Sequence, residues 1–93
     1  MLKIDVVSAH TSFANGWFFI KIDDIDWDRM VAHYLDLSLE EYQEILIKHG
    51  AIIIKTEDLY DEIEEDCYFR NKSDAEKCLI ELEPIYLMAK LIK

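Results

Sequence analysis

The sequence predicts an α+β fold: a small, mostly antiparallel sheet of about four strands covered by three or four helices, in the order β-β-α-α-β-(α)-β-α. Short β-branched and aromatic runs near the N-terminus predict strands, and apolar residues at helical spacing further on predict helices. The chain has 93 residues, is 52% hydrophobic and contains only two glycines and one proline. This composition is typical of one folded domain over residues 1–93.

The first two predicted strands form a hairpin. Residues 2–8, LKIDVVS, alternate in the manner of a strand that is buried on one face. Residues 17–22, WFFIKI, are aromatic and β-branched, and they follow the turn-forming pair Asn15-Gly16. The residues between the two runs, HTSFAN, fit either a loop or an extension of the strands.

Two helices are predicted next. Residues 26–36 carry one apolar stripe at i, i+3, i+4, i+7 and i+8, formed by Trp27, Met30, Val31, Tyr34 and Leu35. The following helix has a capping box, with Ser38 as N-cap and Glu41 three residues later. Leu37 and Tyr42 are spaced for a hydrophobic staple, and Gly50 stands where a helix commonly ends.

The second half of the chain is predicted to add two strands and another helix. Residues 51–54, AIII, and 67–70, CYFR, predict strands. Between them, residues 57–66 fit either an acidic loop or a helix capped by Thr56, with Leu59, Tyr60 and Ile63 facing inward.

The last helix is predicted from a second capping box, Ser73 to Glu76, and its inward residues are Ala75, Cys78, Leu79 and Leu82. Pro84 is expected to disturb this helix. Residues 85–93 fit either a helix or an edge strand.

Charge is distributed very unevenly along the chain. The net charge is −10, but residues 1–22 and 67–93 each carry +1. Residues 23–66 hold fifteen acids against three bases, a net of −12. Such a balance argues against direct binding to nucleic acid or to an anionic membrane. As a helix, residues 57–66 would place one carboxylate per roughly 2 Å, close to the phosphate spacing of duplex DNA.

The compartment is expected to be intracellular. The N-terminus lacks the apolar region of a signal peptide, and no apolar stretch approaches the roughly 18–20 residues that span a bilayer. Cys67 and Cys78 are too few for a disulfide framework and are expected to be reduced thiols.

In residues 22–30, IDDIDWDRM, the side chains of Asp24, Asp26 and Asp28 have the spacing of an EF-hand calcium loop. The loop fails at its sixth and twelfth positions, where Arg29 and Leu35 replace glycine and glutamate. A helix start explains the aspartates better, with Asp24 or Asp26 as cap and Asp28 in the first turn.

No catalytic, metal or cofactor site is predicted. His10, His33 and His49 lack ligand spacing, although His33 and His49 with Cys67 or Asp36 formally offer zinc ligands. No glycine-rich phosphate loop is present, and no carboxylate pair stands out as acid and base. We therefore expect a protein that is not an enzyme and uses no cofactor.

Aromatic residues of the second strand offer a possible contact surface. Neighbouring strand residues point to opposite faces, so Phe18 and its neighbours are not all covered by one layer of helices. Trp17 and Phe19 are therefore possible aromatic contacts.

In size and charge distribution, though not in any motif, the chain resembles the small acidic inhibitors of phages and mobile elements, the anti-CRISPR and anti-restriction proteins that mimic DNA. The resemblance covers Asp23–Asp28, three glutamates of the second helix and Glu57–Asp66. It implies a cytoplasmic protein of a bacterial host cell that binds a basic, nucleic-acid-binding enzyme. The implied contact residues are Asp23, Asp24, Asp28, Glu40, Glu41, Glu44, Glu57, Asp58, Asp61, Glu62, Glu64, Glu65 and Asp66.

Two other hypotheses remain open from the sequence. An antitoxin or immunity protein would use the same acidic surface to neutralise a basic toxin. A structural or regulatory subunit, such as a homo-oligomer, would instead use the aromatic strand face, and its acidity would serve solubility.

Overall fold

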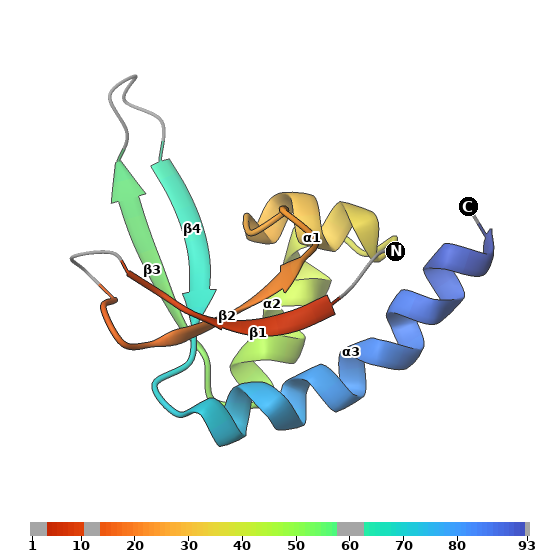
Figure 1. Ribbon diagram of the computed structural model, residues 1–93. Coiled ribbons are helices and arrows are strands. Elements are labelled where there is room, and N and C mark those ends of the chain that lie inside the picture. The colour runs from red at the N-terminus through yellow and green to blue at the C-terminus, as the bar shows by residue number, and fades with distance from the viewer. Residues whose placement is uncertain (1–3, 11–13, 58–62, 93) are drawn as a thin grey trace.

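The computed structural model describes residues 4–10, 14–57 and 63–92 (Figure 1). Within these ranges the predicted α+β fold is confirmed, with four antiparallel strands in two hairpins plus three helices. The elements are β1 Ile4–Ser8, β2 Phe18–Ile22, α1 Asp28–Tyr34, α2 Leu39–Lys48, β3 Ile52–Glu57, β4 Ile63–Tyr68 and α3 Lys72–Ile92.

The N-terminal hairpin forms as predicted. β1 and β2 pair antiparallel from Ile4 opposite Ile22 to Ser8 opposite Phe18. The turn before β2 uses Gly16, whose φ of 84° favours glycine, and the Trp17 N–H donates to the Ala14 carbonyl at 3.0 Å.

The second hairpin corrects the prediction for residues 57–66. Glu57 belongs to β3 and residues 63–66 belong to β4, so the described part of this stretch is neither helix nor loop. Thr56 pairs with Glu64 in the ladder instead of capping a helix, and Ile63 is exposed instead of facing inward. The β-branched run 52–54 supplies a pairing edge, and strand pairing outweighs local helix preference. Residues 58–62, with Leu59 and Tyr60, lie outside the described ranges.

The two hairpins are separate two-stranded sheets, and one isolated bridge joins them within the described ranges. Phe18 and Phe69 exchange backbone hydrogen bonds of 2.8 and 2.7 Å, as an isolated antiparallel bridge. The strand predicted over 67–70 therefore ends at Tyr68, and Phe69 serves as the link between the sheets.

Helix α2 carries the predicted signals at both ends. The Ser38 hydroxyl accepts from the Glu41 N–H at 3.1 Å, and the Glu41 carboxylate accepts from the Ser38 N–H at 3.0 Å. At the other end Gly50 has a φ of 100°, and its N–H and that of Ala51 bond back to the carbonyls of Ile47 and Leu46. This is the Schellman arrangement, in which the left-handed glycine ends the helix.

Helix α3 is one continuous helix of 21 residues. It begins at Lys72, so Ser73 lies inside the first turn and the predicted second capping box is wrong. Pro84 lies on the exposed side of the helix, and the helix continues through it to Ile92. The ambiguous tail is therefore helical up to Ile92, and Figure 1 shows the axis of α3 bending in its second half.

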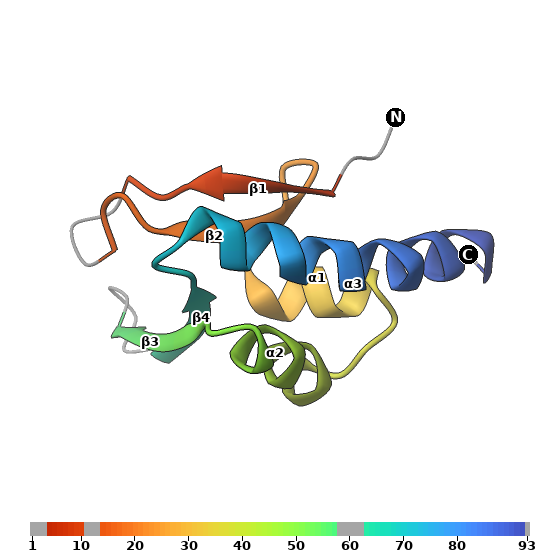
Figure 2. The ribbon, with the colours of Figure 1, turned by 90° about the horizontal axis from the view of Figure 1, so that it is seen from below.

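The core lies where α3, the other helices and the sheets meet. Figure 2 shows the β1–β2 hairpin on one side and β3, β4 and α2 on the other, with α3 running between them. Among the described residues, none of the helices has the length and apolar character that crossing a membrane requires. The buried residues of the core are Ile20, Ile22, Val31, Ala32, Leu35, Tyr42, Leu46, Ala51, Cys67, Phe69, Ala75, Cys78, Leu82 and Tyr86.

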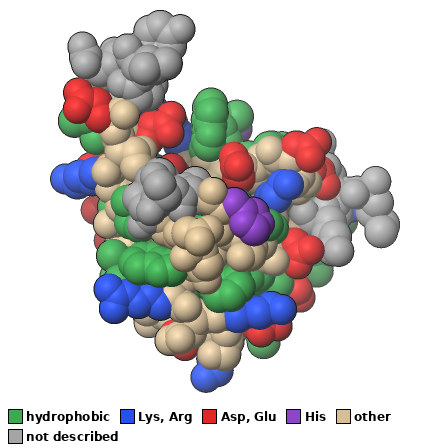
Figure 3. Space-filling view, turned by 60° about the vertical axis from the view of Figure 1, so that its left-hand side comes forward, with side chains coloured by type: hydrophobic (Ala, Val, Ile, Leu, Met, Phe, Trp, Pro, Cys, Tyr) green, Lys and Arg blue, Asp and Glu red, His purple; other side chains and the backbone are tan. Residues whose placement is uncertain are grey.

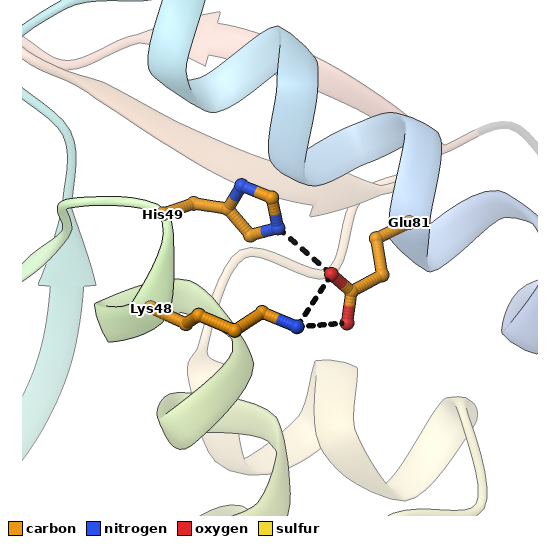
Figure 4. A network of polar contacts seen from close by, with 3 residues as sticks. All are labelled: Lys48, His49 and Glu81. Carbon is orange, nitrogen blue, oxygen red and sulfur yellow. Dashed lines mark hydrogen bonds and ion pairs between the residues drawn. The ribbon is translucent and has the colours of Figure 1, made fainter.

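A surface ion network connects the end of α2 with α3 (Figure 4). Lys48 Nζ lies 2.7 Å from Glu81 Oε1, and His49 Nε2 lies 2.8 Å from the same oxygen. The hydrogen bonds from Lys48 and then His49 lower the pKa of Glu81 below its usual value. The contact holds the C-terminal end of α2 against α3, and its partly exposed pairs contribute little to stability.

Prediction from the caps. Replacing Ser38 with Ala should lower the free energy of unfolding by about 1 kcal/mol, because it removes the hydroxyl that accepts the Glu41 N–H. Ser73→Ala is the matched control, since Ser73 is exposed and lies within α3. It should change stability by less than about 0.5 kcal/mol. Urea unfolding measures both variants, and equal losses would contradict the cap assignment.

Candidate functional site

The orientation of α1 decides which side chains reach the surface. Asp28 heads the inward stripe with an exposure of 3%, followed by Val31, Ala32 and Leu35. Trp27 is 58% exposed and Met30 is 41% exposed, so their predicted places in the buried stripe are wrong. A stripe that begins at Asp28 has the same i, i+3, i+4, i+7 spacing as one that begins at Trp27. Contacts with other elements decide that the stripe beginning at Asp28 is the buried one.

Those contacts are made by the carboxylate of Asp28. Its Oδ2 accepts hydrogen bonds from Gln43 Nε2 at 3.0 Å and from the Cys67 N–H at 2.8 Å. Gln43 Nε2 also donates to the Glu65 carbonyl at 2.9 Å. One buried carboxylate therefore joins α1, α2 and β4.

The start of α1 is capped from another element. Trp27 is the N-cap residue and its side chain makes no cap hydrogen bond, so the predicted capping by Asp24 or Asp26 is wrong. Instead Asp66 Oδ1 on β4 accepts the Asp28 N–H at 3.0 Å. Asp23 and Asp24 form a tight turn after β2, where Asp23 has a φ of 52°.

Burial changes the acidity of both aspartates. Removal from water raises the pKa of Asp28 to about 6, and the hydrogen bonds from Gln43 and Cys67 only partly oppose this effect. Burial also raises the pKa of Asp66, with a further contribution from the negative charge of Asp26. Because the carboxylates of Asp26, Asp28 and Asp66 lie close together, the electrostatic potential at the N-terminal end of α1 is negative.

A hollow of about 400 Å³ lies beside this helix start. Three aromatic side chains and three carboxylates contribute to its wall. Trp27 stands at the start of α1, while Phe19 and Tyr68 meet edge to face with ring centroids 6.0 Å apart. We call this set the acidic–aromatic face: Phe19, Asp26, Trp27, Glu64, Asp66 and Tyr68.

The electrostatic field of the acidic–aromatic face is negative. The pKa of Tyr68 rises to about 12, first through burial and then through the negative charges of Asp66, Asp28, Asp26 and Glu64. The negative charges that oppose ionisation of the Tyr68 phenol also attract a cation, so a bound cation is favoured here. Aromatic walls suit a cation that has a weakly hydrated, planar surface.

A second hollow of about 470 Å³ adjoins the first and shares Trp27, Glu64 and Asp66 with it. Its other lining residues include Leu39 at the start of α2, Glu65 on β4 and one base, Arg29. Glu40 and Glu44 are exposed on α2. Figure 3 shows acidic and apolar side chains next to one another on one face of the molecule.

The structure divides the predicted contact residues into groups. Asp24, Glu40, Glu41, Glu44, Glu57 and Glu65 are exposed, and Asp23, Glu64 and Asp66 are half-buried. Asp28 is buried and accepts hydrogen bonds from Gln43 and Cys67, so it is not available to a partner. The carboxylate of Glu41 accepts the Ser38 N–H in the capping box. Glu65 Oε1 lies 3.4 Å from Lys55 Nζ. Asp58, Asp61 and Glu62 lie outside the described residues.

Both predicted aromatic contacts are half-buried and already have neighbours. Phe18 packs against the core, and Phe19 belongs to the opposite face of β2, as the alternation predicts, whereas Trp17 lies just before the strand. The guanidinium of Arg70 lies 5.1 Å from the centre of the Trp17 ring. Only Phe19 belongs to the acidic–aromatic face.

Among the histidines and cysteines, His10 lines the hollow of the acidic–aromatic face, whereas His49, Cys67 and Cys78 do not. Over residues 4–10, 14–57 and 63–92, no group of three or more His, Cys, Asp or Glu side chains is arranged to hold a metal ion. His49 is engaged with Glu81. Cys67 and Cys78 are separate buried thiols, and burial raises the pKa of Cys78 to about 12.

Trp27 and Tyr68 are the main residues of this face that sequence reasoning missed. The helical stripe assigned Trp27 to the core, and Tyr68 stood in a short predicted strand without a partner. The available signal was the position of Trp27 between two aspartates, because a residue flanked by charges at a helix start is readily exposed.

Comparisons with protein-family models, curated proteins and solved structures give no match to this chain. The function is therefore inferred from the residues of the chain itself.

Prediction from the buried carboxylate. Asp28 titrates near 6 when folded and near 3.8 when unfolded, so its contribution to stability is present below pH 3.8 and is lost as pH rises through 6. Asp28→Asn keeps one oxygen for the two donors and removes this titration. Between about pH 4 and pH 7, the stability of the variant relative to the native protein should rise by up to roughly 3 kcal/mol.

Urea unfolding at several pH values measures this difference. Asp24→Asn is the control, because Asp24 is exposed and each variant removes one negative charge at pH 7. The same pH dependence in both variants would show that overall charge repulsion, and not the buried carboxylate, is responsible.

Proposed function

We propose that this protein is a non-enzymatic inhibitor that binds a basic partner and blocks the nucleic-acid-binding groove of a bacterial defence nuclease or another DNA- or RNA-binding enzyme. The observation that carries the proposal is the acidic–aromatic face, where Asp26, Glu64 and Asp66 lie around exposed Trp27. Its carboxylates take the place of phosphates against lysines and arginines of the groove. The protein acts in the cytoplasm of a bacterial host cell.

The mimicry does not depend on a helical line of charge. Glu64, Glu65 and Asp66 lie on a strand, where successive side chains alternate between faces at a rise of roughly 3.3 Å. Negative charge is instead spread over a surface that includes the residues before α1, the exposed side of α2 and β4. Such a surface meets separate basic side chains of a partner rather than copying one phosphate strand.

The hollow beside Trp27 suits an arginine side chain of the partner. A guanidinium is planar and stacks on aromatic rings, and it donates two parallel hydrogen bonds to a carboxylate. The acidic–aromatic face offers both kinds of group within one hollow. Arginine is also common where enzymes hold phosphate, so the same side chain is present in the proposed target.

A second candidate function uses the same surface. An antitoxin or immunity protein would neutralise a basic toxin through these carboxylates, and its target need not bind nucleic acid. Competition by DNA separates the two functions.

Prediction of partner capture. The immobilised protein should retain a nucleic-acid enzyme from a bacterial lysate, release it as salt is raised from about 0.1 M to about 1 M, and lose it to added DNA. Release by salt with no effect of DNA would support the antitoxin alternative. Capture that persists at high salt and in the presence of DNA would refute the mimicry.

Prediction from the carboxylates. With the captured partner, the double variant Asp26→Asn with Glu64→Gln should bind roughly tenfold more weakly, because two charges of the hollow are lost. Asp36→Asn with Glu76→Gln is the matched control, since both residues are exposed and neither lines the hollow. Titration calorimetry measures the affinities, and equal effects of the two variants would contradict the proposed site.

Prediction from Trp27. Trp27→Ala should weaken partner binding by roughly 30-fold, the loss typical of a buried aromatic anchor at an interface. Met30→Ala is the control because it shortens another exposed apolar side chain of α1. Thermal unfolding should show that both variants remain folded. Unchanged affinity in Trp27→Ala would place the contact elsewhere.

A further inference from the structure

Helix α3 carries apolar residues on two opposite sides. One side is buried and includes Ala75, Cys78, Leu82, Tyr86 and Ala89. The other side is exposed, with Ile80 at 70%, Leu87 at 57%, Met88 at 58% and Leu91 at 81%. A surface helix normally has polar residues on its exposed side. An exposed apolar side such as this one is typical of a protein–protein interface.

The exposed residues follow the spacing of a coiled-coil seam. Ile80, Pro84, Leu87 and Leu91 are separated by four, three and four residues, the a and d positions of two heptads. Met88 lies beside this seam and borders an apolar hollow of about 330 Å³, together with Leu37 and Ile85. We call Ile80, Pro84, Leu87, Met88 and Leu91 the α3 seam.

We propose that the α3 seam is the interface of a homodimer, in which two copies of α3 pack antiparallel about a two-fold axis. This inference is independent of the proposed inhibitory function. Antiparallel packing places Ile80 against Leu91 of the second copy and Pro84 against Leu87, so each of these four residues meets another apolar residue. The hollow beside Met88 gives the second copy room to seat part of its own seam.

Charges on the seam edge select a second copy in this orientation. Glu83 and Lys90 are both exposed, lie seven residues apart, and so follow the same edge of the seam. In an antiparallel pair this edge of one helix faces the same edge of the other. Glu83 of one copy then lies opposite Lys90 of the other, and their positions along the helix axis differ by about 3 Å. The two-fold symmetry forms this pair twice. A parallel pair would place Glu83 beside Met88 instead.

The distribution of charge permits this contact despite a net charge of −10 per chain. Residues 67–93, which contain α3, carry only +1, whereas residues 23–66 carry −12. Figure 1 shows the C-terminal half of α3 on the side of the molecule away from the β3–β4 hairpin. The seam therefore lies in a part of the chain whose small net charge gives little repulsion between two copies.

The dimer is tested by sedimentation equilibrium of the full chain at concentrations from about 10 µM to about 1 mM. The native protein should approach twice the 11.0 kDa mass of one chain as concentration rises. Leu87→Glu with Leu91→Glu should remain monomeric. Ile63→Glu, which alters an exposed isoleucine of β4 outside the seam, should dimerise like the native protein. A native protein that stays monomeric up to the highest concentration overturns the proposal.

A charge exchange tests the orientation and the identity of the partner. Glu83→Lys alone and Lys90→Glu alone should each weaken the dimer about tenfold, because each places like charges opposite one another twice. The double variant with both changes should restore native dimerisation. Failure of the double variant to restore it would overturn the antiparallel pairing, and far-ultraviolet circular dichroism confirms that each variant stays folded.

Discussion

The buried carboxylate of Asp28 is the point on which the arrangement of the middle elements depends. It accepts hydrogen bonds from α2 through Gln43 and from β4 through the Cys67 N–H. In return, the N–H of Asp28 is capped by Asp66. An isolated charge in the interior is costly, and these donors partly offset that cost only when all three elements are in place. The network therefore links the position of α1 to that of β4 with directional contacts that apolar packing lacks.

The same network determines the surface. Because Asp28 turns inward, Trp27 turns outward and stands next to Asp26, Glu64 and Asp66. The strand alternation of β4 brings Glu64, Asp66 and Tyr68 to one face. The burial of one polar side chain, Asp28, thus produces a negative surface with aromatic side chains in its wall. We infer that this surface recognises basic side chains, and its charge favours fast, salt-dependent association.

The molecule combines this acidic surface with an apolar seam in a different part of the chain. The carboxylates belong to residues 23–66, whereas the seam belongs to α3, within residues 67–93, where the net charge is only +1. The proposed inhibitory contact and the proposed dimer contact therefore use different residues. A dimer of this kind would present two acidic surfaces to a partner and increase avidity without any new contact.

The sequence alone determined the fold class, the first hairpin, both ends of α2 and the inward side of the first half of α3, because each depends on local spacing or capping. It also located the charge excess, which needs only counting. Tertiary structure decided the rest. Pairing with β3 made residues 63–66 a strand, since a cross-strand ladder outweighs the local preference of an acidic run. Hydrogen bonds from residues 15 and 39 positions away drew Asp28 inward and left Trp27 exposed, and no pattern within α1 contains those donors.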